Sequence, residues 1–96
     1  MTEVRNLEDT RREIDGIDAR LLELFCRRME LAADVAAYKS RHGLPTLRPE
    51  REKEILDRAE EKAGPVFAPY ARRFFNGIMG LSREYQEELR QTEASE

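Results

Sequence analysis

The amino-acid sequence predicts an all-helical (all-α) fold with three helices per chain, one long N-terminal helix and two shorter ones. Two observations lead to this prediction. Apolar residues recur in a heptad pattern from Leu7 to Arg41, and charged residues make up 39% of the sequence. Many charged residues combined with helical periodicity are typical of helices whose outer faces lie in water.

The first helix is predicted from Leu7 to Arg41, a stretch that contains no proline. Its apolar residues occupy the a and d positions of about four heptads, as in a helix that packs against other helices. We call these residues the seam: Leu7, Ile14, Ile17, Leu21, Leu24, Leu31, Val35 and Tyr38. A glycine at position 16 costs only about 1 kcal/mol, and the heptads stay in phase across it. A continuous helix is therefore favoured over a break at Gly16.

The length of this helix predicts an oligomer. At about 1.5 Å per residue the helix would span roughly 50 Å, whereas a compact chain of this size has a radius of gyration near ~13 Å. A helix of that length cannot bury its seam against its own chain alone. The simplest arrangement is a two-fold dimer with a shared core.

Glycine and proline divide the rest of the chain. Gly43 suits the end of the first helix and Pro45 prevents its continuation, so residues 42–48 are predicted to form a loop. The second helix is predicted from Pro49, a residue favoured at a first helical position, to Ala63.

The third helix is predicted to begin after Pro65 or Pro69 and to end near Gln91. The whole chain, residues 1–96, is interpreted as one domain whose ordered helical part covers about residues 5–90. The aromatic residues expected in its core are Phe67, Phe74, Phe75 and Tyr85.

Composition argues against several classes of protein. The net charge of −3 argues against a nucleic-acid partner. No apolar run approaches the ~18 residues of a membrane span, and residues 1–15 lack the apolar region of a signal peptide. The single cysteine, Cys26, excludes an intrachain disulfide and favours the cytoplasm. One cysteine and one histidine, His42, do not make an ordinary zinc site, so no metal is predicted.

Polar residues interrupt the apolar faces of all three predicted helices. Arg28 occupies an a position, and no residue three or four positions away from it is acidic. Its partner is therefore either an acidic residue elsewhere in the protein, in a structural ion pair, or an anionic ligand. Lys39 shares its face, because 11 residues correspond to about 1100° of helix. Glu52 lies on the apolar side of the second helix, and Ser82 and Gln86 lie on that of the third. Together these residues predict a small polar cavity that binds an anion inside a helical bundle.

Arg11 is open to two interpretations. It lies roughly 25 Å along the helix from Arg28 and therefore cannot reach the same small ligand from the same chain. In an antiparallel dimer, Arg11 of one subunit could approach Arg28 and Lys39 of the other. Alternatively, Arg11 pairs with Asp15 at the surface, a contact that contributes only a few tenths of a kcal/mol.

The other polar residues also have purely structural alternatives. Glu52 could interact with the helix dipole or pair with Arg48 or Lys53. Ser82 is small enough for close helix packing, and Gln86 could be an exposed amide. Each signal alone is ambiguous, and the prediction of a site depends on their convergence.

These residues resemble those of a known family, the all-helical chorismate mutases of the AroQ class. The resemblance covers roughly residues 5–90. It depends on LEDTRREIDGIDARLLELFCRRMELAADVAAYK, on RPEREKEIL after a proline-containing loop, and on FFNGIMGLSREYQ. The specific signature is the ordered set Arg11, Arg28, Lys39, Arg51, Glu52, Ser82 and Gln86.

The resemblance implies an isomerase that converts chorismate to prephenate by a Claisen rearrangement, in the biosynthesis of phenylalanine and tyrosine. It also implies an intertwined homodimer with two active sites. A pericyclic rearrangement requires no nucleophile, metal or redox cofactor, so the resemblance implies no cofactor.

The resemblance also implies roles for individual residues. Arg28 and the partner subunit's Arg11 would bind the two substrate carboxylates, with help from Ser82. Lys39 and Gln86 would donate hydrogen bonds to the ether oxygen, where negative charge develops as the C–O bond breaks.

Near the start of the second helix, the resemblance implies that Glu52 and the backbone at Arg51 bind the ring hydroxyl. Many members carry aspartate at the position of Arg48, which also belongs to the substrate-binding set. An arginine there, directly before Pro49, either turns outward or adds positive potential at the entrance.

Two other functions remain open. An isochorismate pyruvate-lyase shares the fold and most of the cationic site, but in that branch the position of Glu52 is not a carboxylate. A non-catalytic helical dimerisation module, or a regulatory domain without activity, would need none of the site residues.

Overall fold

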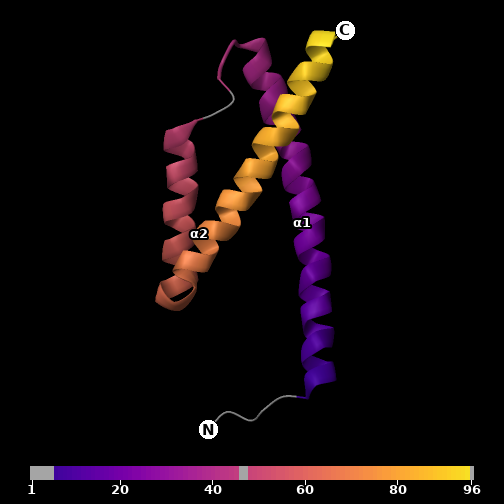
Figure 1. Ribbon diagram of the computed structural model, residues 1–96, viewed down its shortest axis with the longest axis vertical. Helices are drawn as coiled ribbons and strands as arrows, with labels where there is room; N and C mark the ends of the chain where they lie inside the picture. The colour runs from indigo at the N-terminus through magenta and orange to yellow at the C-terminus, as the bar shows by residue number, and fades with distance from the viewer. Residues whose placement is uncertain (1–5, 46–47, 96) are drawn as a thin grey trace. The chain divides into compact units, whose positions relative to one another are not determined.

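The computed structural model describes residues 6–45 and 48–95, and the regular structure in these ranges is entirely α-helical (Figure 1). Helix α1 spans Leu7–Arg41 and helix α2 spans Pro49–Ser95. The predicted all-helical class is confirmed. The chain forms two compact units, which divide within α1 between Leu31 and Ala32.

Helix α1 has the predicted bounds and runs unbroken through Gly16. Asn6 begins it as an N-cap, because its Oδ1 atom accepts hydrogen bonds from the backbone N–H groups of Glu8 at 2.8 Å and Asp9 at 3.3 Å. The two carboxylates in the first turn add a favourable interaction with the helix dipole. The N-terminus of α1 is thus determined by local side chains.

Helix α1 ends in a Schellman motif. Gly43 adopts a φ of 64°, a left-handed conformation that glycine tolerates well. The Leu44 N–H donates to the Lys39 carbonyl at 2.8 Å, and the Gly43 N–H donates to the Ser40 carbonyl at 3.4 Å. This motif fixes the last turn of α1, on which Lys39 lies.

The prediction of three helices is wrong in number, because α2 contains both shorter helices in one element. They form two segments, residues 49–63 and 65–95, separated by a single non-helical residue, Gly64. Its φ of 82° and ψ of 169° lie in a region that only glycine readily adopts. Helical structure resumes directly at Pro65, so no loop separates the segments, and Figure 1 shows α2 reversing direction between them.

The second segment of α2 also extends further than predicted. It continues to Ser95, past the expected end near Gln91. The Thr92 hydroxyl donates to the Glu88 carbonyl at 3.0 Å within this last part. The predicted frayed residues 1–5 lie outside the described residues.

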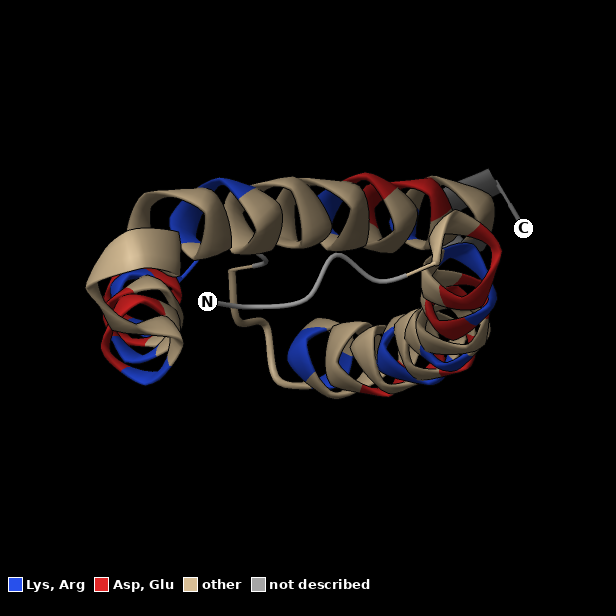
Figure 2. Ribbon diagram, turned by 90° about the horizontal axis from the view of Figure 1, so that it is seen from below, with Lys and Arg blue, Asp and Glu red and all other residues tan. Residues whose placement is uncertain are grey.

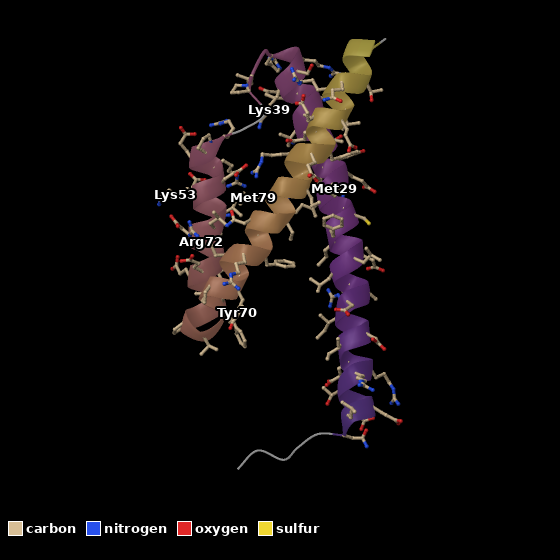
Figure 3. The ribbon with its side chains drawn as sticks, viewed as in Figure 1. Met29, Lys39, Lys53, Tyr70, Arg72 and Met79 are labelled. Atoms are coloured by element: carbon tan, nitrogen blue, oxygen red, sulfur yellow. The ribbon has the colours of Figure 1, made fainter. Side chains whose placement is uncertain are left out.

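In the second unit, the end of α1 and both segments of α2 pack on one another. The buried apolar residues come from each of the three: Ala32, Leu56 and Met79. Arg72 joins the two segments of α2 by ion pairs to Glu60 at 2.9 Å and Asp57 at 3.7 Å (Figure 3). The reversal at Gly64 is therefore supported by both apolar and charged contacts.

Large apolar side chains are exposed along the helices of the single chain. All residues of the seam are between 44% and 62% exposed. Phe67 and Phe74 are exposed as well, so their predicted placement in the core is wrong for the isolated chain. Acidic and basic residues are distributed along all the helices (Figure 2). Within the described ranges, no helix is long and apolar enough to span a membrane.

Replacing Gly64 with alanine should destabilise the protein, because a Cβ atom disfavours its backbone conformation by about 1–3 kcal/mol. The same substitution at Gly16, inside α1 with no atom close to the added Cβ, should stabilise the protein by up to about 1 kcal/mol. Urea unfolding of the two variants measures both effects. Equal effects of the two substitutions would contradict a special backbone requirement at Gly64.

Candidate functional site

Ser82 and Gln86 are the buried polar side chains among the described residues, each 8% exposed. They lie one helical turn apart on the second segment of α2. The Gln86 Nε2 atom donates to the Ala32 carbonyl of α1 at 3.0 Å, and the Ser82 hydroxyl donates to the Ile78 carbonyl at 3.1 Å. Because an amide nitrogen carries two hydrogens, the bond to Ala32 leaves Gln86 one donor for a ligand.

Lys39 is half-buried on the last turn of α1 (Figure 3). Burial lowers the pKa of Lys39 from the ordinary lysine value, because the ammonium loses part of its hydration. The positive charge of Arg48 also lowers this pKa, whereas the negative charge of Glu52 raises it. These three groups therefore lie close enough to act on one another electrostatically.

Glu52 is half-buried in the first turn of α2, and its partner is Arg83 on the second segment. The Arg83 Nη1 atom donates to both carboxylate oxygens of Glu52, at 2.6 Å and 2.5 Å. The predicted alternative of a Glu52–Lys53 pair is wrong, since Lys53 pairs with Asp57 at 2.7 Å. The side chain of Arg51 pairs at the surface with Glu54 at 3.4 Å.

Arg83 was not predicted as a site residue from the sequence. Its partner lies 31 residues away, and helical spacing connects only residues three or four positions apart. The available signal was indirect: a carboxylate on an apolar helix face requires a cation, and Arg83 directly follows Ser82. Several arginines could have paired with Glu52. Arg83 could be identified as its partner only once the rotation of one segment of α2 against the other was known.

A cavity of about 320 Å³ lies between the end of α1 and the end of α2. Its lining includes both Lys39 and Gln86, and alanines and leucines supply much of its apolar wall. This volume is within the range of small-molecule sites. The second unit thus places a lysine ammonium and an amide at one small cavity.

Of the predicted site residues, only Lys39 and Gln86 belong to the described lining of this cavity, which does not include Glu52 or Ser82. Arg11 is exposed and Arg28 is half-buried on the part of α1 that belongs to the first unit. No ion pair joins Arg11 to Asp15 in the part of the chain that the structure describes. Arg48 is exposed directly before α2. The roles predicted for these arginines stay predictions.

The described residues define an all-helical protein in which a lysine ammonium and a glutamine amide lie at one small cavity. Residues 10–87 match the family described as chorismate mutase type II. This match covers most of the chain, and the protein belongs to that family.

Curated relatives agree with this assignment. The chain is 43% identical over 63 residues to a 4-amino-4-deoxychorismate mutase of Streptomyces venezuelae, a match that covers 66% of this chain and 61% of that protein. It is 46% identical over 55 residues to the chorismate mutase of Methanocaldococcus jannaschii, covering 57% of this chain and 56% of that one. It is 46% identical over 67 residues to the T-protein of Haemophilus influenzae, covering 67% of this chain but 18% of that protein.

The chain thus spans less than two thirds of the length of these relatives. No solved structure matches it significantly.

The pKa of Lys39 can be measured directly by NMR titration of its side chain. We expect a pKa below the ordinary 10.5. Arg48→Ala should raise this pKa because it removes a repelling positive charge, and Glu52→Gln should lower it because it removes an attracting negative charge. Arg58→Ala, on the exposed surface of α2, serves as the control and should leave the pKa unchanged. Shifts of the opposite sign would contradict the proximity of the three groups.

Proposed function

We propose that this protein is a chorismate mutase, an isomerase that converts chorismate to prephenate in the biosynthesis of phenylalanine and tyrosine. Membership of the type II family supports the proposal. The structural observation that carries it is the presence of Lys39 and Gln86 at one cavity of suitable size. We assign the protein to the cytoplasm on the composition alone.

The chemistry of the rearrangement suits these residues. A pericyclic reaction needs its flexible dianionic substrate held in a compact, reactive conformer. As the C–O bond breaks, negative charge develops on the ether oxygen, and donors fixed beforehand stabilise the transition state. The Lys39 ammonium and the second N–H of the Gln86 amide supply such donors. The hydrogen bond from Gln86 to Ala32 supports this role, because it holds the amide in place.

The other side chains of the proposed site bind the rest of the substrate. Arg28 and the partner subunit's Arg11 pair with the two carboxylates, for which the planar guanidinium is well suited. Ser82 assists at one carboxylate. Near the ring hydroxyl, Glu52 accepts a hydrogen bond and the backbone at Arg51 completes the contact.

A homodimer is part of this proposal. The exposed seam of α1 supports it, since contiguous apolar surface of this kind marks a protein interface. In an antiparallel arrangement, each site receives Arg11 from the other subunit. The dimer therefore both covers the seam and completes the two sites.

Two related enzyme activities must be distinguished from that of a chorismate mutase. The name of the Streptomyces relative refers to 4-amino-4-deoxychorismate, in which an amine would replace the ring hydroxyl. We propose chorismate instead, because the family that matches most of the chain is chorismate mutase type II. The carboxylate at Glu52 favours the mutase over an isochorismate pyruvate-lyase.

Incubation of the purified protein with each of the three substrates tests this proposal. We expect loss of chorismate with formation of prephenate as the dominant reaction. Dominant release of pyruvate from isochorismate, or faster conversion of 4-amino-4-deoxychorismate, would overturn the choice of substrate. Inactivity towards all three would favour a non-catalytic dimerisation module, for which Arg28→Ala would leave stability unchanged or improved.

Lys39→Ala should lower kcat by about 100- to 1000-fold, the usual cost of removing one donor to a developing oxyanion. The circular dichroism spectrum and the elution volume should stay those of the folded dimer. Lys53→Ala, which removes an exposed lysine from α2, provides a matched control with near-normal turnover. Near-normal turnover of Lys39→Ala would contradict the role of this ammonium.

Mixing two inactive variants tests whether Arg11 acts on the partner's site. After unfolding and refolding together, Arg11→Ala and Lys39→Ala chains should recover about a quarter of the wild-type activity, because half of the dimers are mixed and each has one intact site. If Arg11 served its own subunit, no site in the mixture would be intact. A mixture that stays inactive would contradict the action of Arg11 on the partner's site, and a chain that remains monomeric at micromolar concentration would contradict the proposed dimer.

A further inference from the structure

We propose that Arg83 is a positioning residue of this site: its guanidinium holds the Glu52 carboxylate in one orientation and keeps it from pairing with Lys39. The inference rests on the proposed function, because Glu52 and Lys39 are the groups that it places at the substrate. Arg83 itself need not touch the substrate.

The contact between Arg83 and Glu52 is closely defined. One guanidinium nitrogen of Arg83 donates to both carboxylate oxygens, at 2.6 Å and 2.5 Å. The Glu52 side chain is 25% exposed and that of Arg83 is 40% exposed, so water competes only in part for this contact. Charge-assisted hydrogen bonds that engage both oxygens restrict rotation of a carboxylate.

The position of Arg83 on α2 connects it to the other site residues. Arg83 follows the buried Ser82 and lies three positions before Gln86, so Arg83 and Gln86 are neighbours on the helix surface. Gln86 is anchored to α1 through the Ala32 carbonyl, whereas Arg83 reaches the first segment of α2. Neighbouring residues of one segment thus contact the two elements that carry Lys39 and Glu52.

Electrostatics give this contact a consequence for Lys39. The negative charge of Glu52 already acts on Lys39. A carboxylate released from Arg83 would be attracted to the nearby ammonium, and a direct ion pair would neutralise the charge that the rearrangement needs. It would also leave the ring hydroxyl without its acceptor. Arg83 therefore keeps Glu52 available to the ring hydroxyl and Lys39 available to the ether oxygen.

A second ion pair in the same unit provides a matched control. Arg72 also joins the two segments of α2, through Glu60 at 2.9 Å, and its side chain is 42% exposed. It lies 11 residues before Arg83, or roughly 16 Å along the segment. Removing either arginine breaks ion pairing between the same two segments, with Glu60 and Asp57 in the case of Arg72, but of the two arginines only Arg83 contacts Glu52.

The experiment compares Arg83→Gln with Arg72→Gln in the full chain. We expect similar decreases in the urea midpoint for both variants, but a loss of about tenfold in kcat/KM for Arg83→Gln alone. In the Glu52→Gln background, Arg83→Gln should cost less than about twofold, since no carboxylate remains to be positioned. Arg83→Lys, which keeps a cationic donor, should retain at least half of the wild-type kcat/KM.

NMR titration of Lys39 supplies a readout that does not depend on turnover. Arg83→Gln should raise the pKa of Lys39 when Glu52 is present and have a much smaller effect in the Glu52→Gln background. Unchanged kinetics together with an unchanged Lys39 pKa would overturn the inference, as would equal losses of kcat/KM in both backgrounds. A wild-type protein inactive with chorismate would instead contradict the proposed function, and the Lys39 titration would then decide the inference alone.

Discussion

The reversal of α2 at Gly64 is the constraint on which the second unit depends. One glycine with positive φ turns the chain back without a loop, so the two segments of α2 meet in a fixed register. In that register Arg72 reaches Glu60 and Arg83 reaches Glu52. A flexible loop at this point would allow the segments to slide, and the pairing of charges between them would no longer be specified.

The same register decides where polar groups are buried. Gln86 is removed from water but keeps a hydrogen bond to the Ala32 carbonyl, so the cost of its burial is offset. Lys39 is only half-buried, and the lowered pKa reflects that partial loss of hydration. In the proposed site, the hydrogen bond to Ala32 would hold the Gln86 amide in place before a ligand arrives, which would reduce the reorganisation needed at the moment of reaction.

Elements with local signals could be predicted from the sequence, and elements that depend on distant contacts could not. Both ends of α1, the start of α2 at Pro49 and the break at Gly64 follow from caps, turns and heptads. The predicted number of helices was wrong because Gly64 and Pro65 indicate a break in the helix but do not specify that helical structure resumes at the next residue. Phe67 and Phe74 were misplaced because an apolar residue favours burial without specifying whether any other segment of the chain lies close enough to cover it.

By itself, the sequence determined the all-helical class, the length of α1 and the type II family, because periodicity and an ordered set of polar residues are properties of the chain alone. It also identified Lys39, Glu52, Ser82 and Gln86 as polar exceptions on apolar faces. Only the tertiary structure decided the partners of these residues. The contact of Arg83 with Glu52 depends on how one segment of α2 is rotated against the other, and helical spacing carries no information about that rotation.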